Sequence, residues 1–222
     1  MIAVITLAHD LDMTHQDLRR RLDLASSARP NLGRPRDHYT AIDTFLAIAS
    51  RHNAAMVDAI APLVRDLPGG HDLAHEYLAA SRSYEEALAL VKARLYGSIY
   101  AVGRPWPGIW AEVHRELEAV CALELRLAEA LLAEDDHTGD GPQDLGARLH
   151  HAELASPTRP HPWIPHQGVT GHLARVVARR VDRFWDAAEG RMVPEPVRHH
   201  DRTHQGRLTQ YLLADPHLDA DE

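Results

Sequence analysis

The chain has 222 residues and a formal net charge of −8 at pH 7. This length suits one domain, or one domain with an appendage. Proteins that bind nucleic acids need positive charge to neutralise the phosphate groups, and this acidic chain has a negative net charge, so we expect no nucleic-acid partner. No run approaches the roughly 18 apolar residues that a helix needs to cross a bilayer. The single cysteine, Cys121, permits no internal disulfide. The N-terminus lacks a signal-peptide pattern. We therefore predict a cytoplasmic protein without a membrane partner.

Proline and glycine divide the first part of the chain into four segments in which apolar residues return every three or four positions, the period of an α-helix. Alanine and leucine dominate while phenylalanine occurs only twice, which also favours helix over sheet. Pro62 should kink or tighten the last turn of the second helix. Because the connections are short, we predict an all-α fold with an up-down-up-down four-helix bundle over residues 1–135. Its helices are expected at residues 12–27, 37–66, 71–97 and 109–134.

Residues 136–222 form an extension of different character. A short helix is predicted at 144–154, and the segment 156–167 holds four prolines, which exclude regular helix or strand and make it a strap. An amphipathic helix follows at 170–188, and we expect its apolar face to cover the bundle. A short apolar run, 208–213, lies near the acidic end of the chain.

Histidine is unusually frequent, with 17 residues, and each predicted bundle helix has one close to its apolar stripe. Helical bundles build metal sites from histidines and carboxylates on facing helices. His114 and Glu118 lie one helical turn apart, where both side chains can reach the same ion. A single histidine on an apolar face is more often a hydrogen-bonded core residue, so both readings stay open. The four candidates are His15, His52, His75 and His114.

Three stretches resemble the hemerythrin-like (His-His-Glu cation-binding) family: the first-helix motif at 15–18, the second-helix motif at 51–62 with its histidine and terminal proline, and the last-helix motif at 114–118. The resemblance covers about residues 10–135. It implies iron bound by the four histidines and Glu118, and a role in handling or sensing O₂, peroxide or nitric oxide.

The chain departs from this family where Met56 takes the place of the second-helix glutamate. The loss of one carboxylate leaves a site for one iron or zinc ion, or for two irons if another group replaces it, and Glu85 on the third helix is the best substitute. The alternative is a metal-free adaptor that binds a protein partner, which both Met56 and the long extension favour. No motif of a hydrolase appears, so the sequence leaves open whether the protein is an enzyme. Cys121 should be a small buried residue, or else a thiol near the metal.

Overall fold

The computed structural model describes residues 2–29, 35–98, 101, 103–138, 145–164, 168–188 and 193–196. These residues form seven helices and contain no strand, so the all-α prediction is confirmed. No helix among them is long and apolar enough to cross a membrane. The predicted apolar run 208–213 and the last three residues of the strap lie outside the described residues. The helices are α1 (Ile2–Ser27), α2 (Pro35–Ala59), α3 (Ala61–Arg65), α4 (His71–Leu95), α5 (Trp106–Thr138), α6 (Leu145–Ala155) and α7 (Gly168–Ala188).

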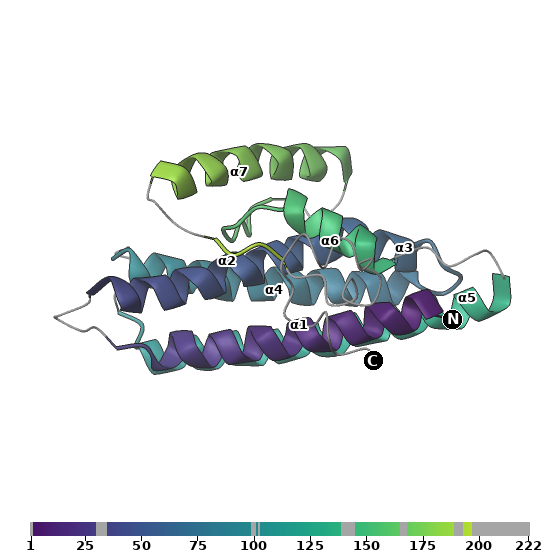
Figure 1. Cartoon of the computed structure of the whole chain (residues 1–222), viewed down its shortest axis with the longest axis horizontal. Helices are drawn as coiled ribbons and strands as arrows, with labels where there is room; N and C mark the ends of the chain where they lie inside the picture. Colours follow the sequence, from purple (N-terminus) through teal and green to yellow (C-terminus); the bar gives the residue numbers. More distant parts are fainter. Residues whose placement is uncertain are drawn as a thin grey trace, which may run out of the picture.

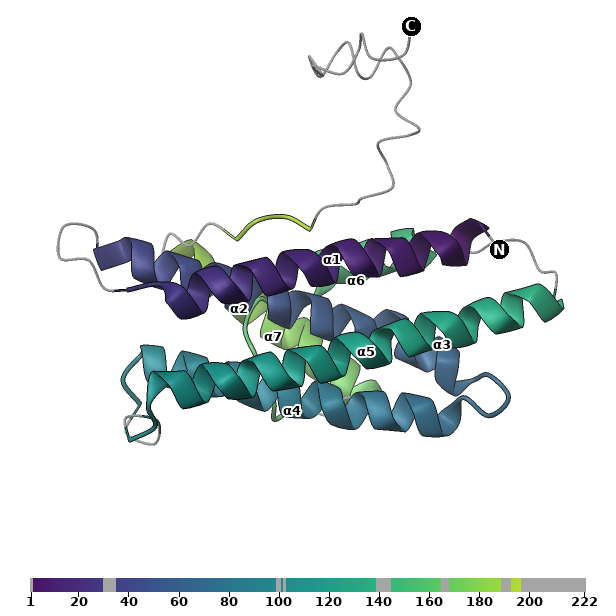
Figure 2. The ribbon, with the colours of Figure 1, turned by 90° about the horizontal axis from the view of Figure 1, so that it is seen from below.

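The four long helices α1, α2, α4 and α5 lie side by side and form a ring of contacts, in which α1 touches α2 and α5 while α4 touches the same two helices. Figures 1 and 2 show this set, with α6 and then α7 stacked on the side of α2. Successive long helices run in opposite directions, because their short connections join neighbouring ends. The arrangement gives one shared interior to which all four helices contribute.

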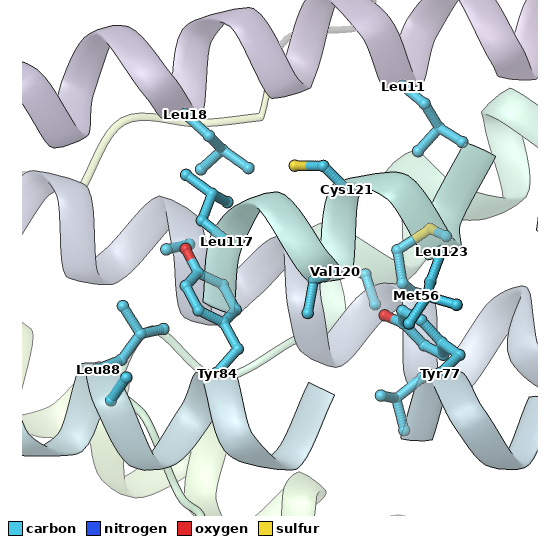
Figure 3. Close-up of a cluster of buried hydrophobic side chains, with 14 of the residues drawn as sticks. Leu11, Leu18, Met56, Tyr77, Tyr84, Leu88, Leu117, Val120, Cys121 and Leu123 are labelled. Atoms are coloured by element: carbon cyan, nitrogen blue, oxygen red, sulfur yellow. The ribbon is translucent and has the colours of Figure 1, made fainter. Parts of the chain in front are cut away.

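The interior is built mainly from leucine, alanine and valine, as the sequence requires, and two tyrosines are its largest fully buried side chains. Figure 3 shows part of this core, with Tyr77 and Tyr84 of α4 facing side chains of α5 and Met56 of α2 close to Tyr77. Cys121 is 2% exposed and lies in the same core, so the prediction of a buried cysteine is confirmed.

Helix α1 begins at Ile2, ten residues before the predicted start at residue 12. Leu7 and Leu11 continue the buried stripe of Leu18 and Leu22 at steps of four and seven residues. The early start therefore extends one helical face rather than adding a new element.

The second predicted helix divides into α2 and α3 at Ile60, two residues before Pro62, as expected for a proline near the end of a helix. The turn into α4 then depends on two glycines. Gly69 has φ of +75°, a left-handed conformation that favours glycine, and a Cβ on Gly70 would lie 1.8 Å from the carbonyl oxygen of Val64. These glycines bring α3 back against α4.

Helix α7 does not cover the other helices with its apolar face, and that prediction is wrong. Its large apolar side chains point outward, and its buried side is polar. The strap explains this orientation, because its backbone N–H groups belong to no helix or sheet and need other hydrogen-bond acceptors. Asp182 accepts hydrogen bonds from the backbone N–H groups of Thr158 and Arg159 at 3.0 Å each. Arg175 adds a link to Asp58 of α2. The exposed apolar residues are Leu173, Val176, Val177, Val181 and Phe184.

Candidate metal centre

Three buried side chains from three helices converge in the interior. The Oε2 atom of Glu124 on α5 lies 2.7 Å from Nε2 of His15 on α1 and 3.1 Å from Nε2 of His52 on α2. One ligand atom from each residue lies within 4.8 Å of the others. The exposed fractions are 1% for His15, 3% for His52 and 0% for Glu124, so water has almost no access to the group. We call these three residues the triad.

The helical period places each member of the triad on a buried face. His15 lies four residues after Leu11 and three before Leu18, both of which belong to the core. Glu124 stands in the same relation to Val120 and Leu127 on α5. Each polar side chain therefore replaces one apolar residue in an otherwise continuous stripe, and the ring of helices brings the three replacements together.

Two further groups hold the triad in place. The hydroxyl of Tyr77 on α4 donates a hydrogen bond of 3.2 Å to Oε1 of Glu124, the oxygen that faces away from the imidazoles. On the other side, Oε1 of Glu153 on α6 lies 2.9 Å from Nδ1 of His52. Both nitrogens of His52 thus face carboxylates, while both oxygens of Glu124 have partners. A carboxylate on the far nitrogen of a histidine fixes its ring orientation and raises its basicity as a metal ligand.

The charges of this group are strongly coupled. Burial by itself would lower the pKa of His52, but the negative charges of Glu124 and Glu153 raise it to about 10. Burial would raise the pKa of Glu124, and His52 together with His15 lowers it to about 2. The pKa of the Tyr77 hydroxyl is well above its usual value because of burial and the nearby Glu124 charge. Without a metal, these contacts favour the protonated form of His52 and the ionised form of Glu124.

The same donor set fits one divalent cation. Two neutral imidazole nitrogens and one carboxylate oxygen are ligands that suit iron or zinc. Glu124 and Glu153 carry two negative charges, which equal the charge of a divalent ion when both imidazoles are neutral. A divalent ion bound here would therefore leave no net charge in the core, which avoids the cost of an unpaired buried charge.

The predicted ligands fall into two sets. The structure brings His15 and His52 together, but it places His75 on the exposed side of α4, where Tyr77 takes the inward position. The side chain of His114 is 43% exposed and lies 3.9 Å from Asp23. The structure does not bring these last two histidines to the triad.

The two predicted carboxylate ligands also lie elsewhere. The side chain of Glu118 is 54% exposed and accepts two hydrogen bonds from Arg19, which lower its pKa. Glu85 is buried, with 8% exposure, but does not belong to the triad. Met56, where the family has a glutamate, is fully buried among apolar side chains near Tyr77. Within the described part of the chain, the triad is the only cluster of this kind.

Sequence reasoning missed Glu124, Tyr77 and Glu153. The sequence does contain a sign that Glu124 is special. It has apolar residues three or four positions away on both sides, and a glutamate is unusual within such a buried stripe. Tyr77 has a weaker signal, since it follows Ala74 by three residues and precedes Ser81 by four. Nothing in the sequence indicates Glu153, because its contact with His52 depends on how α6 folds back onto α2.

A cavity of about 360 Å³ lies beside the triad, on the surface between α1, α2 and α6. Glu153 is one of its lining residues, and Arg51, next to His52 in the chain, is another. A molecule in this cavity would meet the carboxylate that contacts His52, but not the triad itself.

Comparison of the sequence with protein-family models gave no match, and comparisons with curated proteins and with solved structures gave no significant match.

Proposed function

We propose that this chain is a hemerythrin-like helical protein that binds one divalent metal ion, iron(II), through His15, His52 and Glu124. The observation that supports this most directly is the convergence of three ligand atoms within 4.8 Å in a buried interior. Two histidines and one carboxylate with open coordination positions are the ligand set typical of mononuclear non-haem iron. The four-helix up-down-up-down bundle expected from the resemblance agrees with this assignment, since such bundles carry metal ligands on their inward faces.

The residues around the triad have distinct roles in this proposal. Glu153 orients the His52 ring and keeps the proton on Nδ1, so that Nε2 can bind the metal. Tyr77 holds Glu124 through its second oxygen. The bound iron would supply a redox-active Lewis acid with positions for O₂, peroxide or nitric oxide. The surrounding apolar side chains would exclude bulk water and admit only small ligands.

We propose one metal rather than two. A two-metal site needs bridging carboxylates to offset the second cation, and Met56 removes the glutamate that the family would supply. Glu85 and Glu118, the other predicted carboxylates, are not members of the triad. Glu153 is already used by His52.

The test is metal content in single variants, measured by elemental analysis and visible absorption on protein made without a histidine tag in iron-supplemented cells. His52→Ala and Glu124→Ala should each lose the metal. His75→Ala and His114→Ala are matched controls from the set that the sequence predicted, and they should keep it. About one iron per chain is expected for the unmodified protein.

Two results would contradict the proposal. Metal far below one equivalent in the unmodified protein, unchanged by His52→Ala, would remove the metal site. Equal loss of metal from His114→Ala and His52→Ala would indicate a different ligand set, closer to the one that the motif spacing predicts. Zinc at one equivalent, lost with the same variants, would keep the site but exclude redox chemistry at the metal.

A second candidate is a metal-free adaptor. The distances of 2.7 and 3.1 Å within the triad are those of hydrogen bonds, so the imidazolium–carboxylate network is complete without an ion. The exposed apolar face of α7 would then suit a protein partner. This candidate predicts that the unmodified protein contains no stoichiometric metal and that iron or zinc added to EDTA-treated protein does not raise its melting temperature.

A further inference from the structure

A second cavity, of about 230 Å³, lies between α2, the strap and α7. Three arginines line it: Arg51 from α2, and Arg179 and Arg183, one turn apart on α7. The lining also includes Asp186 and Thr158. None of the triad residues takes part. The cavity thus gathers three cationic side chains from two helices that are far apart in the sequence.

The arginines have unused hydrogen-bond donors. Among the described residues, the Nε atoms of Arg51 and Arg179 are buried and have no hydrogen-bond partner, while another nitrogen of Arg51, Nη1, donates to the carbonyl oxygen of Pro194 at 2.6 Å. Burial, with the nearby charges of Arg183 and Arg180, also lowers the pKa of Arg179. A buried donor without a partner is unfavourable, and more so when it is charged. Both arginines therefore keep donor capacity beside the cavity.

Two aspartates of α7 accept hydrogen bonds from the strap. Asp186 accepts a hydrogen bond of 2.6 Å from the Thr158 hydroxyl and another of 3.2 Å from Arg159. Asp182 accepts the two backbone N–H groups of the strap. Arg51 faces the negative charges of Glu153, Asp186 and Glu195, so the excess of positive charge at the cavity comes mainly from Arg179 and Arg183.

We propose that this cavity binds a phosphate group. A phosphate dianion matches three guanidinium groups better than a single negative charge does, and arginine binds phosphate through paired donors with suitable planar geometry. The volume is below the roughly 300–1,000 Å³ of pockets for drug-sized ligands, which suits a small anion. The phosphate can come from inorganic phosphate or from a small phosphate monoester, because both offer the same oxygens to the arginines.

The experiment is calorimetric titration of the full-length protein with inorganic phosphate at constant ionic strength. EDTA is present throughout, so that phosphate cannot bind through a metal at the triad. The unmodified chain should bind one phosphate, and Arg179→Gln and Arg183→Gln should each weaken binding by about tenfold or more, the loss of one charge-assisted hydrogen bond. Arg180→Gln removes the same charge from the adjacent position, outside the cavity, and should change affinity less than twofold.

Arg183 is exposed, so its substitution leaves the fold intact even if the Arg179 variant unfolds, and circular dichroism checks both. The proposal is overturned if phosphate does not bind, or if Arg180→Gln weakens binding as much as the two cavity variants, because the effect would then be one of general surface charge. A parallel titration with phenyl phosphate distinguishes the sources. Tighter binding of the ester supports a phosphate monoester as the ligand, and weaker binding supports the free anion.

Discussion

Glu124→Gln is the most informative single substitution, because one carboxylate serves three partners. In the metal-free protein it removes the negative charge that faces His15 and His52 and weakens the acceptor for Tyr77. Breaking a buried pair by removing one partner costs about 3–5 kcal/mol. Glutamine has the same size and keeps one oxygen for Tyr77, and His52 can release its proton. We therefore expect the lower end, a loss of about 3 kcal/mol in the free energy of unfolding.

The measurement is urea denaturation followed by circular dichroism, at pH 6 with EDTA. Glu118→Gln is the matched control on the same helix, since it removes a carboxylate whose side chain is 54% exposed and paired with Arg19. Exposed pairs of this kind contribute less than about 1 kcal/mol. A loss for Glu124→Gln no larger than that for Glu118→Gln would refute the view that the triad is a charged, buried network.

Four other outcomes follow from the same geometry. Glu153→Gln should lower metal affinity by about 10–100-fold while leaving the metal bound at saturation, measured by titration against a chelator, and an unchanged affinity would contradict its orienting role. The pKa of His52 is raised from 6.5 to about 10, so its contribution to stability is complete below pH 6.5 and is lost as the pH rises towards 10; the EDTA-treated protein should unfold in less urea at pH 9 than at pH 6. Cys121 is 2% exposed and burial raises its pKa, so a thiol reagent should modify it only at the rate of unfolding, and rapid labelling of the native chain would show otherwise. Met56→Glu buries a carboxylate without a partner and should destabilise the metal-free protein by about 2 kcal/mol or more, with added metal restoring stability only if the new carboxylate reaches an ion.

The helices were predictable because their positions depend on local periodicity. Each buried stripe repeats at three and four residues, and proline or glycine marks most ends. The predicted start of α1 is ten residues too late, although Leu7 and Leu11 lie on the same buried stripe as Leu18 and Leu22. Periodicity also failed for α7. It predicts correctly which residues share a face, but it does not say whether that face meets the protein or the solvent.

Two of the three residues of the triad could be predicted from the sequence. His15 and His52 were found because a histidine within an apolar stripe is visible in one dimension. The spacing of one turn after a histidine points on α5 to Glu118 rather than to Glu124, but Glu118 faces solvent. Glu118 and Glu124 are six residues apart, so their side chains point about 120° apart around the helix axis, and only contacts between helices decide which of them is buried. His75 shows the same limit, since it is two residues from the buried Tyr77 and yet exposed.

The predicted boundary at residue 135 separates parts that cooperate in the folded chain. Helix α6 follows that boundary, but Leu145 and Leu149 belong to the hydrophobic core and Glu153 reaches His52 on α2. If the first 135 residues acted alone, His52 would lose the carboxylate on its Nδ1 atom and the core would lose part of its cover. The second helix has Met56 where the hemerythrin-like family has a glutamate. Glu153 of the extension supplies a negative charge in its place, although at a different position. The extension is in this sense part of the candidate site.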